Sequence, residues 1–523
     1  MAMQSNLLDV PLLRLTPLDN FTVRDAVQGV CVTGGIGSGK TSGSGAALAQ
    51  AYLRAGMGGL VLCAKPEEVD LWKGYCATTG RSNSLIVVDG STPIVNDFDY
   101  DLACQGPGGV NSSVELAMKK VEIARNASPS PGRQGEAFWE DTIRQMLRHA
   151  IPVLLASKGK VESADLLAIV RSAPTSVEQL QDPEWQRKSA FYAFFRAASD
   201  RLDDATGERL MAYWAHDFAM LDPKTRGNII ISLTTAFDRF NHGWLRTAFS
   251  TETMVPPELT FHGAIIVLAM PALTLHEDGI IAQQLYKYLW QRAVLARNAL
   301  SPEQRTRPVF LWADEAQYFV NSFDAEYLST CRGSLACTVY LTQSLPTYYA
   351  KLAGDGGHDR VHHLLGNFAT RIWHNNACAE TNEWAARTLG KIVKKRASYN
   401  ESQGSNTSYG MNMGEGSSWN REAKDSNFAG VGGFGWSQNP LWGREGSEGG
   451  SDNWGRNRGH GTNSSVTHGS SEVMEYIIEP GEFGRILKTG GPANDYRVSG
   501  IWYQAGRYFK ASGGSAFLSE FAQ

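Results

Sequence analysis

A glycine-rich segment near the start of the chain restricts its possible folds more than any other feature. Residues 34–41 read Gly-Gly-Ile-Gly-Ser-Gly-Lys-Thr, a full match to the phosphate-binding pattern G-x-x-x-x-G-K-[ST]. The apolar, β-branched residues 29–33 before it predict a buried strand, and the Ala-rich residues 44–53 after it predict a helix. A strand, a glycine-rich turn and a helix together bring backbone N–H groups onto phosphate oxygens.

The residues of this loop have separate expected roles in holding a nucleotide. Lys40 is expected to reach the β- and γ-phosphates, and the hydroxyl of Thr41 is expected to hold Mg²⁺. The predicted cofactors are therefore ATP and Mg²⁺, although the loop alone does not separate ATP from GTP. The predicted nucleotide-binding residues are Gly34, Gly35, Gly37, Ser38, Gly39, Lys40, Thr41 and Ser42.

A second motif, far along the chain, supplies acidic residues. Residues 309–315 read Val-Phe-Leu-Trp-Ala-Asp-Glu, an apolar run that ends in two carboxylates. Asp314 is expected to hold the water shell of Mg²⁺, and Glu315 to orient or deprotonate the attacking water. An acidic strand end is also a common solvated cap, but its combination with residues 34–41 favours the catalytic interpretation.

Two polar residues beyond this motif are further candidates for the catalytic site. Gln343 follows the strand predicted over 338–342, where its amide can contact the γ-phosphate and report hydrolysis. Arg332 lies between the acidic pair and that strand, and it could act across a subunit interface as an arginine finger. The alternative for Arg332 is an ordinary surface arginine at a helix end.

The spacing of the motifs indicates an insertion within an α/β domain. Lys40 and Asp314 lie 274 residues apart, and the residues between them show helical periodicity with almost no strand signal. Alternating strands and helices on both sides predict the α/β class with a mainly parallel sheet. The predicted units are 1–110 (first part of the nucleotide-binding domain), 111–255 (inserted all-α domain), 256–400 (second part of the nucleotide-binding domain), 401–470 and 471–523.

The last two units differ from the rest in composition. Residues 401–470 hold 16 of the 54 glycines and several tryptophans, a composition that predicts a flexible segment. The alternative is an arm whose tryptophans stack on bases or on a partner. Residues 471–523 are expected to complete the nucleotide-binding domain with strands at 472–478, 484–487, 497–504 and 507–510.

Bulk properties narrow the cellular setting. The formal net charge is −4, so the chain as a whole has no basic footprint for nucleic acid. Its seven scattered cysteines form no C-x-x-C pair, which favours a reducing compartment. No apolar run reaches the length of a membrane span, and no secretion signal is recognisable. The expected location is the cytoplasm, with attachment to the inner membrane through a partner as a further option.

The chain resembles the type IV secretion coupling proteins, the TraG/TraD-like conjugative DNA-transfer ATPases related to the FtsK/HerA translocases. The resemblance covers roughly residues 25–400 and, weakly, 471–510. It implies a RecA-like motor domain with an all-α domain, hexameric rings, and ATP-driven handling of DNA or protein substrates at a secretion channel. The residues that carry it are 34–41, 60–68, 137–139, 311–315, 342–344 and 366–372.

This sequence departs from that family in two respects. Membrane-anchored members begin with transmembrane helices that are not seen here, and residues 401–470 lie outside the family core. The predicted function is an ATP-hydrolysing motor that translocates or recruits DNA, or a nucleoprotein, to a type IV secretion or related system. The alternative is a non-translocating P-loop ATPase that acts as an assembly switch or protein-substrate adaptor in a mobile-element or defence complex.

Overall fold

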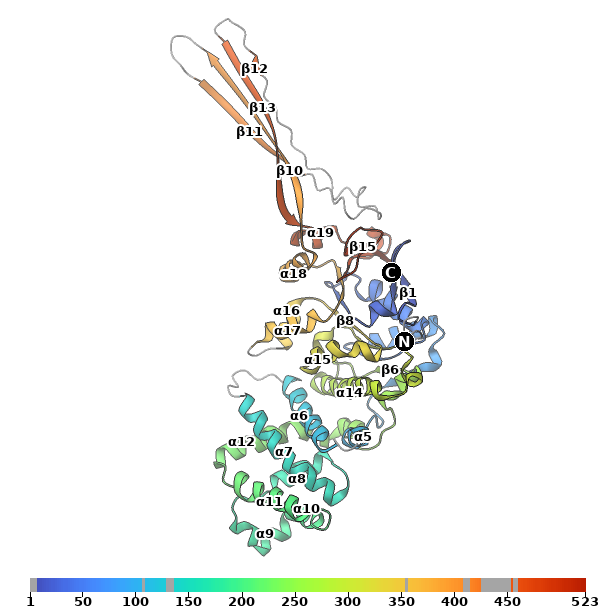
Figure 1. The fold of residues 1–523 in the computed structure, drawn as a ribbon, viewed down its shortest axis with the longest axis vertical. Coiled ribbons are helices and arrows are strands. Elements are labelled where there is room, and N and C mark those ends of the chain that lie inside the picture. The colour runs from blue at the N-terminus through green and yellow to red at the C-terminus, as the bar shows by residue number, and fades with distance from the viewer. Residues whose placement is uncertain are drawn as a thin grey trace.

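A nine-stranded sheet forms the centre of the protein, for which a computed structural model describes residues 7–105, 109–127, 136–352, 356–407, 414–424, 453–454 and 460–523 (Figure 1). The strand order is β15-β14-β9-β3-β8-β7-β4-β6-β5. The seven strands from β9 to β5 are parallel, and β14 runs antiparallel to both β9 and β15. The predicted α/β class with a mainly parallel sheet is confirmed. The strands are β3 (Val30–Thr33), β4 (Gly58–Leu62), β5 (Leu85–Val88), β6 (Ile265–Leu268), β7 (Val309–Ala313), β8 (Ala336–Thr342), β9 (Thr370–His374), β14 (Arg497–Gln504) and β15 (Ala516–Ala522).

The central strands are apolar throughout because helices cover both faces of the sheet. In β7, Leu311 packs into the core on one face, whereas Phe310 and Trp312 pack into the core on the other. This alternation follows from the two-residue period of a strand. Helices α2, α3 and α4 supply buried residues to the core on the face of Phe310 and Trp312. Helices α14 to α17 supply buried residues to the core on the face of Leu311. These helices are α2 (Val23–Ala26), α3 (Ala46–Arg54), α4 (Glu67–Thr78), α14 (His276–Ala296), α15 (Phe323–Thr330), α16 (Leu345–Lys351) and α17 (Gly357–Gly366).

A bundle of helices occupies the chain between β5 and β6 and lies below the sheet in Figure 1. Its core is continuous with the sheet face covered by α14. The first helix begins at Asp97, earlier than the expected start of the insertion at 111, so the exact domain boundary remains a prediction. Residues 128–135, which contain Pro, Gly and Ser, lie outside the described residues. The helices are α5 (Asp97–Gln105), α6 (Gly109–Ala127), α7 (Glu136–Lys158), α8 (Ser163–Arg171), α9 (Pro183–Lys188), α10 (Ala190–Ala198), α11 (Asp204–Ala212), α12 (Pro223–Asp238) and α13 (Gly243–Phe249).

A second sheet projects from the opposite end of the molecule (Figure 1). Its strand order is β11-β10-β13-β12, and β10 pairs with β13 from Lys391↔Tyr476 to Thr407↔His460. Residues 401–470 were expected to be flexible, yet wherever the structure describes them they form extended strands. The rest of that segment lies outside the described residues. The strands are β10 (Lys391–Thr407), β11 (Gly414–Lys424), β12 (Asn453–Trp454) and β13 (His460–Tyr476).

Two of the strands predicted after residue 471 are wrong. Residues 484–487 lie mostly in helix α19 (Phe483–Ile486), because Glu479 and Glu482 form a capping box around Pro480 that starts a helical turn. The partner of β14 is β15 rather than residues 507–510. The backbone N–H of Lys510 donates instead to the carboxylate of Asp19, in the turn that follows the N-terminal strand β1 (Pro11–Arg14).

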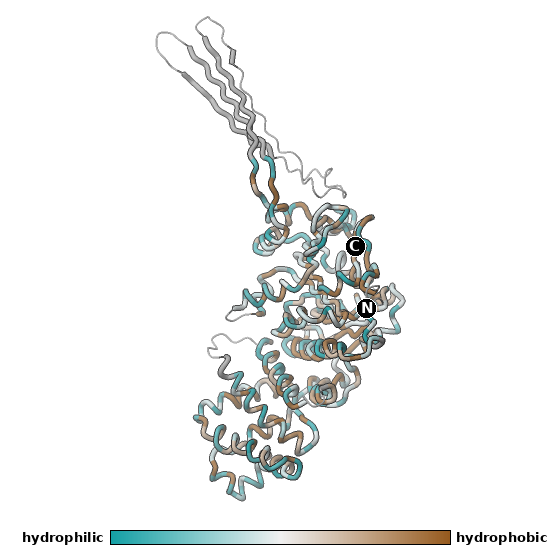
Figure 2. The backbone as a smooth tube through the Cα atoms, viewed as in Figure 1, coloured by the Kyte–Doolittle hydropathy of each residue, from teal (hydrophilic) through white to brown (hydrophobic). Residues whose placement is uncertain are grey.

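Apolar residues are distributed through the sheet and the helical bundle, as Figure 2 shows by hydropathy. β2 (Asn20–Thr22) pairs with β1 beside this body, and α18 (Ala379–Leu389) joins α19 in a small third core. Within the described part of the chain, no helix combines the length and the apolar character needed to cross a bilayer.

Candidate nucleotide site

The glycine-rich loop joins β3 to the helical segment that leads into α3. Gly37 and Gly39 have φ angles of 72° and 81°, a backbone region that favours glycine. A Cβ on Gly34 would lie 2.7 Å from the Cβ of His374, so the loop leaves no room for a side chain there. The N–H of Gly35 donates to the carbonyl of Asn375 at 2.8 Å and ties the loop to the end of β9. The loop is therefore held in shape by its neighbours.

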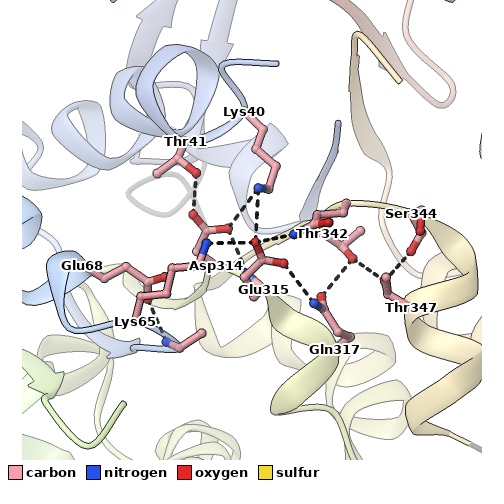
Figure 3. Close-up of polar contacts among 12 residues, drawn as sticks. Lys40, Thr41, Lys65, Glu68, Asp314, Glu315, Gln317, Thr342, Ser344 and Thr347 are labelled. Atoms are coloured by element: carbon pink, nitrogen blue, oxygen red, sulfur yellow. Dashed lines mark hydrogen bonds and ion pairs between the residues drawn. The ribbon is translucent and has the colours of Figure 1, made fainter. Parts of the chain in front are cut away.

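The two sequence motifs meet at the carboxyl ends of β3 and β7. The hydroxyl of Thr41 donates to the carboxylate of Asp314, across 273 residues of sequence. The ammonium of Lys40 lies 3.4 Å from Oε1 of Glu315 and 3.9 Å from Oδ1 of Asp314 (Figure 3). Both carboxylates are buried. β8 lies between β3 and β7, and the carboxyl ends of these three parallel strands share one edge of the sheet. That edge is where open α/β sheets bind ligands.

Glu315 is the most heavily contacted residue of the site. Its backbone has φ 50° and ψ 47° directly after β7. Its carboxylate accepts hydrogen bonds from the amides of Gln317 at 2.9 Å and Gln343 at 3.0 Å. Burial would raise the pKa of Glu315, but the charge of Lys40 and these amide donors outweigh burial and lower the pKa to about 2. Glu315 is therefore an ionised, oriented hydrogen-bond acceptor at neutral pH.

Gln343 reaches this carboxylate from the end of β8. The neighbouring Thr342 donates its hydroxyl to Oε1 of Gln317 at 3.0 Å. The strand carrying Gln343 and the turn after Glu315 are thus joined through side chains.

Lys65 and Glu68, which follow β4, were not singled out as site residues from the sequence. The ammonium of Lys65 donates to Oε1 of Glu315 at 3.2 Å, although its side chain is 43% exposed. Burial, together with the charge of Asp314, raises the pKa of Glu68 to about 8. Both residues lie in segment 60–68, which helps to carry the family resemblance, but the resemblance assigned them no role. Their position after a strand that ends at the same edge of the sheet could have indicated one.

The C-terminal hairpin of β14 and β15 covers the back of the loop. Nε2 of His374 lies 2.7 Å from the hydroxyl of Ser44, and its Nδ1 lies 2.9 Å from the carbonyl of Ser499. Burial lowers the pKa of His374 to about 4, so the ring is neutral. Because a carbonyl only accepts, Nδ1 carries the proton and Nε2 accepts from Ser44. The amide of Gln523 donates to the hydroxyl of Ser42 at 2.8 Å.

Arg332 does not lie with the other candidates. It is exposed in a short 3₁₀ turn, Cys331–Ser334, that precedes β8. Gln343 follows the other end of β8, a strand of seven residues, which spans roughly 23 Å at about 3.3 Å per residue. Arg332 therefore cannot reach the phosphate position of its own chain.

The oxygen donors at the loop fit a magnesium ion. A hydroxyl from Thr41 and a carboxylate from Asp314 are hard ligands of the kind Mg²⁺ takes, alongside waters and nucleotide phosphates. In the part of the chain that the structure describes, no three His, Cys, Asp or Glu side chains converge closely enough to hold a metal ion among themselves. The site thus suits an ion that brings its own waters rather than one enclosed by protein.

Comparison with known proteins relates the fold to a conjugation protein. No protein-family profile and no curated protein sequence matches the chain. The unbound bacterial conjugative coupling protein TrwBdeltaN70 superposes with a TM-score of 0.53 at 12% identity, covering 100% of this chain and 92% of TrwBdeltaN70. The plasmid coupling protein TrwB in complex with the GTP analogue GDPNP gives 0.50 at 13% identity, covering 100% and 93%. At sequence identities this low, these superpositions show that the fold is shared and nothing beyond the fold.

Proposed function

We propose that the chain is a Mg²⁺-dependent ATPase motor that moves DNA, or a nucleoprotein, and that works as a hexameric ring. The observation that carries the proposal is the convergence of Lys40, Thr41, Asp314 and Glu315 from two segments 273 residues apart. The fold shared with TrwB, a conjugative coupling protein crystallised with a nucleotide analogue, supports it.

The residues have complementary tasks in this proposal. Lys40 and the loop amides bind the phosphates, and Ser42 lies beside them at the start of the helical segment. Thr41 and Asp314 would hold Mg²⁺, which would supply positive charge against the phosphates. Glu315 orients the attacking water and accepts its proton. Gln343 contacts the γ-phosphate, so the loss of this phosphate changes the contacts of Gln343 at the end of β8.

The rate of ATP hydrolysis with and without DNA tests this function. The purified full chain should hydrolyse ATP faster when single- or double-stranded DNA is added, because a motor couples ATP hydrolysis to movement along its DNA substrate. Light scattering on the same samples should show a particle of about six copies with an ATP analogue. A monomeric protein whose ATPase rate does not change with single- or double-stranded DNA would contradict the motor function. It would favour the alternative function as an assembly switch.

Arg332 should be needed for ATP hydrolysis in the active site of a neighbouring subunit. Arg332→Ala is expected to lower the ATPase rate at least about 100-fold, because an arginine finger contributes roughly 10³–10⁵ to phosphoryl transfer. Mixing Arg332→Ala with Glu315→Gln should restore part of the rate, since mixed rings contain sites with both groups intact. Arg387→Ala, at an exposed arginine paired with Glu383, is the control. A parent rate in Arg332→Ala alone would leave Arg332 as a surface residue.

A cavity in the helical bundle favours recruitment of a protein substrate as the second candidate function. It lies between α10 and α11 and combines aromatic and acidic side chains, a surface suited to a basic, amphipathic peptide. Stable protein cargo together with no DNA stimulation would favour this adaptor role over the motor. The lining residues are Tyr192, Phe195, Arg196, Ser199, Leu202, Asp203, Asp204, Gly207, Glu208 and Met211.

A further inference from the structure

Glu68 is a buried carboxyl group with an unused oxygen. It lies in the first turn of α4, and only 8% of its surface is exposed. Oε2 accepts a hydrogen bond from the backbone N–H of Ala64 at 2.8 Å, which fixes the orientation of the side chain. Among the residues that the structure describes, Oε1 has no hydrogen-bond partner. A buried polar atom left in this way costs free energy unless a ligand satisfies it.

The surroundings of Glu68 point to a cationic ligand. Glu68, Thr41 and Asp314, which are labelled in Figure 3, line one cavity. Its remaining walls are leucine and aromatic side chains, Leu62, Leu71, Trp72, Tyr75 and Trp312. The nearby ammonium of Lys65 is engaged with Glu315 rather than with Glu68. Two carboxyl groups beside each other in a buried site repel when both are ionised. A divalent cation at Thr41 and Asp314 would remove that repulsion.

We propose that Glu68 is part of the cation site, and that its Oε1 accepts a hydrogen bond from a water bound to Mg²⁺. This inference rests on the proposed function. A water-mediated role fits the side chains present, because they do not converge into a direct metal cage and Mg²⁺ keeps several of its waters in proteins. Glu68 is a positioning residue that acts through the metal-bound water, and it orients the shell from the side of β4 and α4.

The affinity for Mn²⁺ tests this role separately from turnover. Mn²⁺ replaces Mg²⁺ in such sites, and its binding to the full chain with ADP is followed by electron paramagnetic resonance. Glu68→Gln should weaken Mn²⁺ binding about 10-fold or more, since outer-shell partners typically contribute 10- to 100-fold to metal affinity. ADP affinity in the absence of metal should not change. Glu67→Gln, at the exposed neighbour in the same turn, is the matched control and should match the parent protein.

The outcomes separate this inference from the proposed function. Equal Mn²⁺ affinity in the parent protein and Glu68→Gln, both with ADP bound, would overturn the inference alone. Failure of the parent protein to bind ADP at all would overturn the proposed function and the inference with it. If Glu68→Gln does not fold, Glu68→Asp decides: weaker Mn²⁺ binding with unchanged ADP affinity supports the role, and parent affinity overturns it.

Discussion

Glu315→Gln should bind ATP about as tightly as the parent protein and hydrolyse it about 10²–10⁴-fold more slowly, the range of general-base catalysis. The amide keeps the size of the side chain and can still meet Gln317 or Gln343. It cannot accept the proton of the attacking water, and it carries no charge to orient that water. Binding and chemistry are separated in this variant because the phosphates are held by Lys40 and the loop amides.

Single-turnover hydrolysis and equilibrium binding of a fluorescent ATP analogue measure the two effects. Glu326→Gln, at an exposed carboxylate on α15, is the control and should retain the parent rate. Hydrolysis at the parent rate in Glu315→Gln would show that another group activates the water. Loss of both binding and hydrolysis would show that Glu315 chiefly holds the site together.

Lys40→Met should bind ATP at least about 100-fold more weakly and show no measurable turnover. The ammonium of Lys40 is the charge that the loop offers to the phosphates, and removing one member of a buried ion pair typically costs about 3–5 kcal/mol, which is a factor of 10² or more in binding. Without nucleotide, the variant also leaves Asp314 and Glu315 with Lys65 as their nearest remaining cation. Its free energy of unfolding should therefore fall as well.

Isothermal titration calorimetry and thermal unfolding without nucleotide check these two effects. Lys73→Met is the control, because that lysine pairs with Asp70 on the exposed side of α4. It should leave ATP affinity and the unfolding temperature unchanged. ATP affinity close to the parent value in Lys40→Met would mean that the loop amides alone hold the phosphates.

The central sheet could be predicted from local sequence because its strands are buried on both faces. β7 coincides with the apolar part of the 309–315 motif, since this apolar run begins after Pro308 and is followed by Asp314. In the C-terminal part, the strand predicted over 497–504 has the bounds of β14, but the strand that pairs with it was not predicted. The sequence of residues 507–510 predicts a strand, but the backbone N–H of Lys510 donates a hydrogen bond to Asp19. Local sequence cannot predict this contact, because Asp19 lies near the other end of the chain.

The nucleotide site shows the same division. Lys40, Thr41, Asp314 and Glu315 were named from motifs, because phosphate and metal chemistry require those residue types at those positions. Their roles stay predictions. Lys65, Glu68 and His374 reach the site only through strand order and packing, which no motif records. The position of Arg332 at the far end of β8 likewise depended on the fold.

The contact between Gln523 and Ser42 has a consequence for the synthesis of the protein. The two residues are 481 positions apart, so a ribosome adding about 5–20 residues per second needs roughly 25–95 seconds between them. During that interval the glycine-rich loop exists without the hairpin that lies behind it. Nascent chains halted before β14 should therefore lack the two contacts that the hairpin makes beside the loop, from Gln523 to Ser42 and from Ser499 to His374.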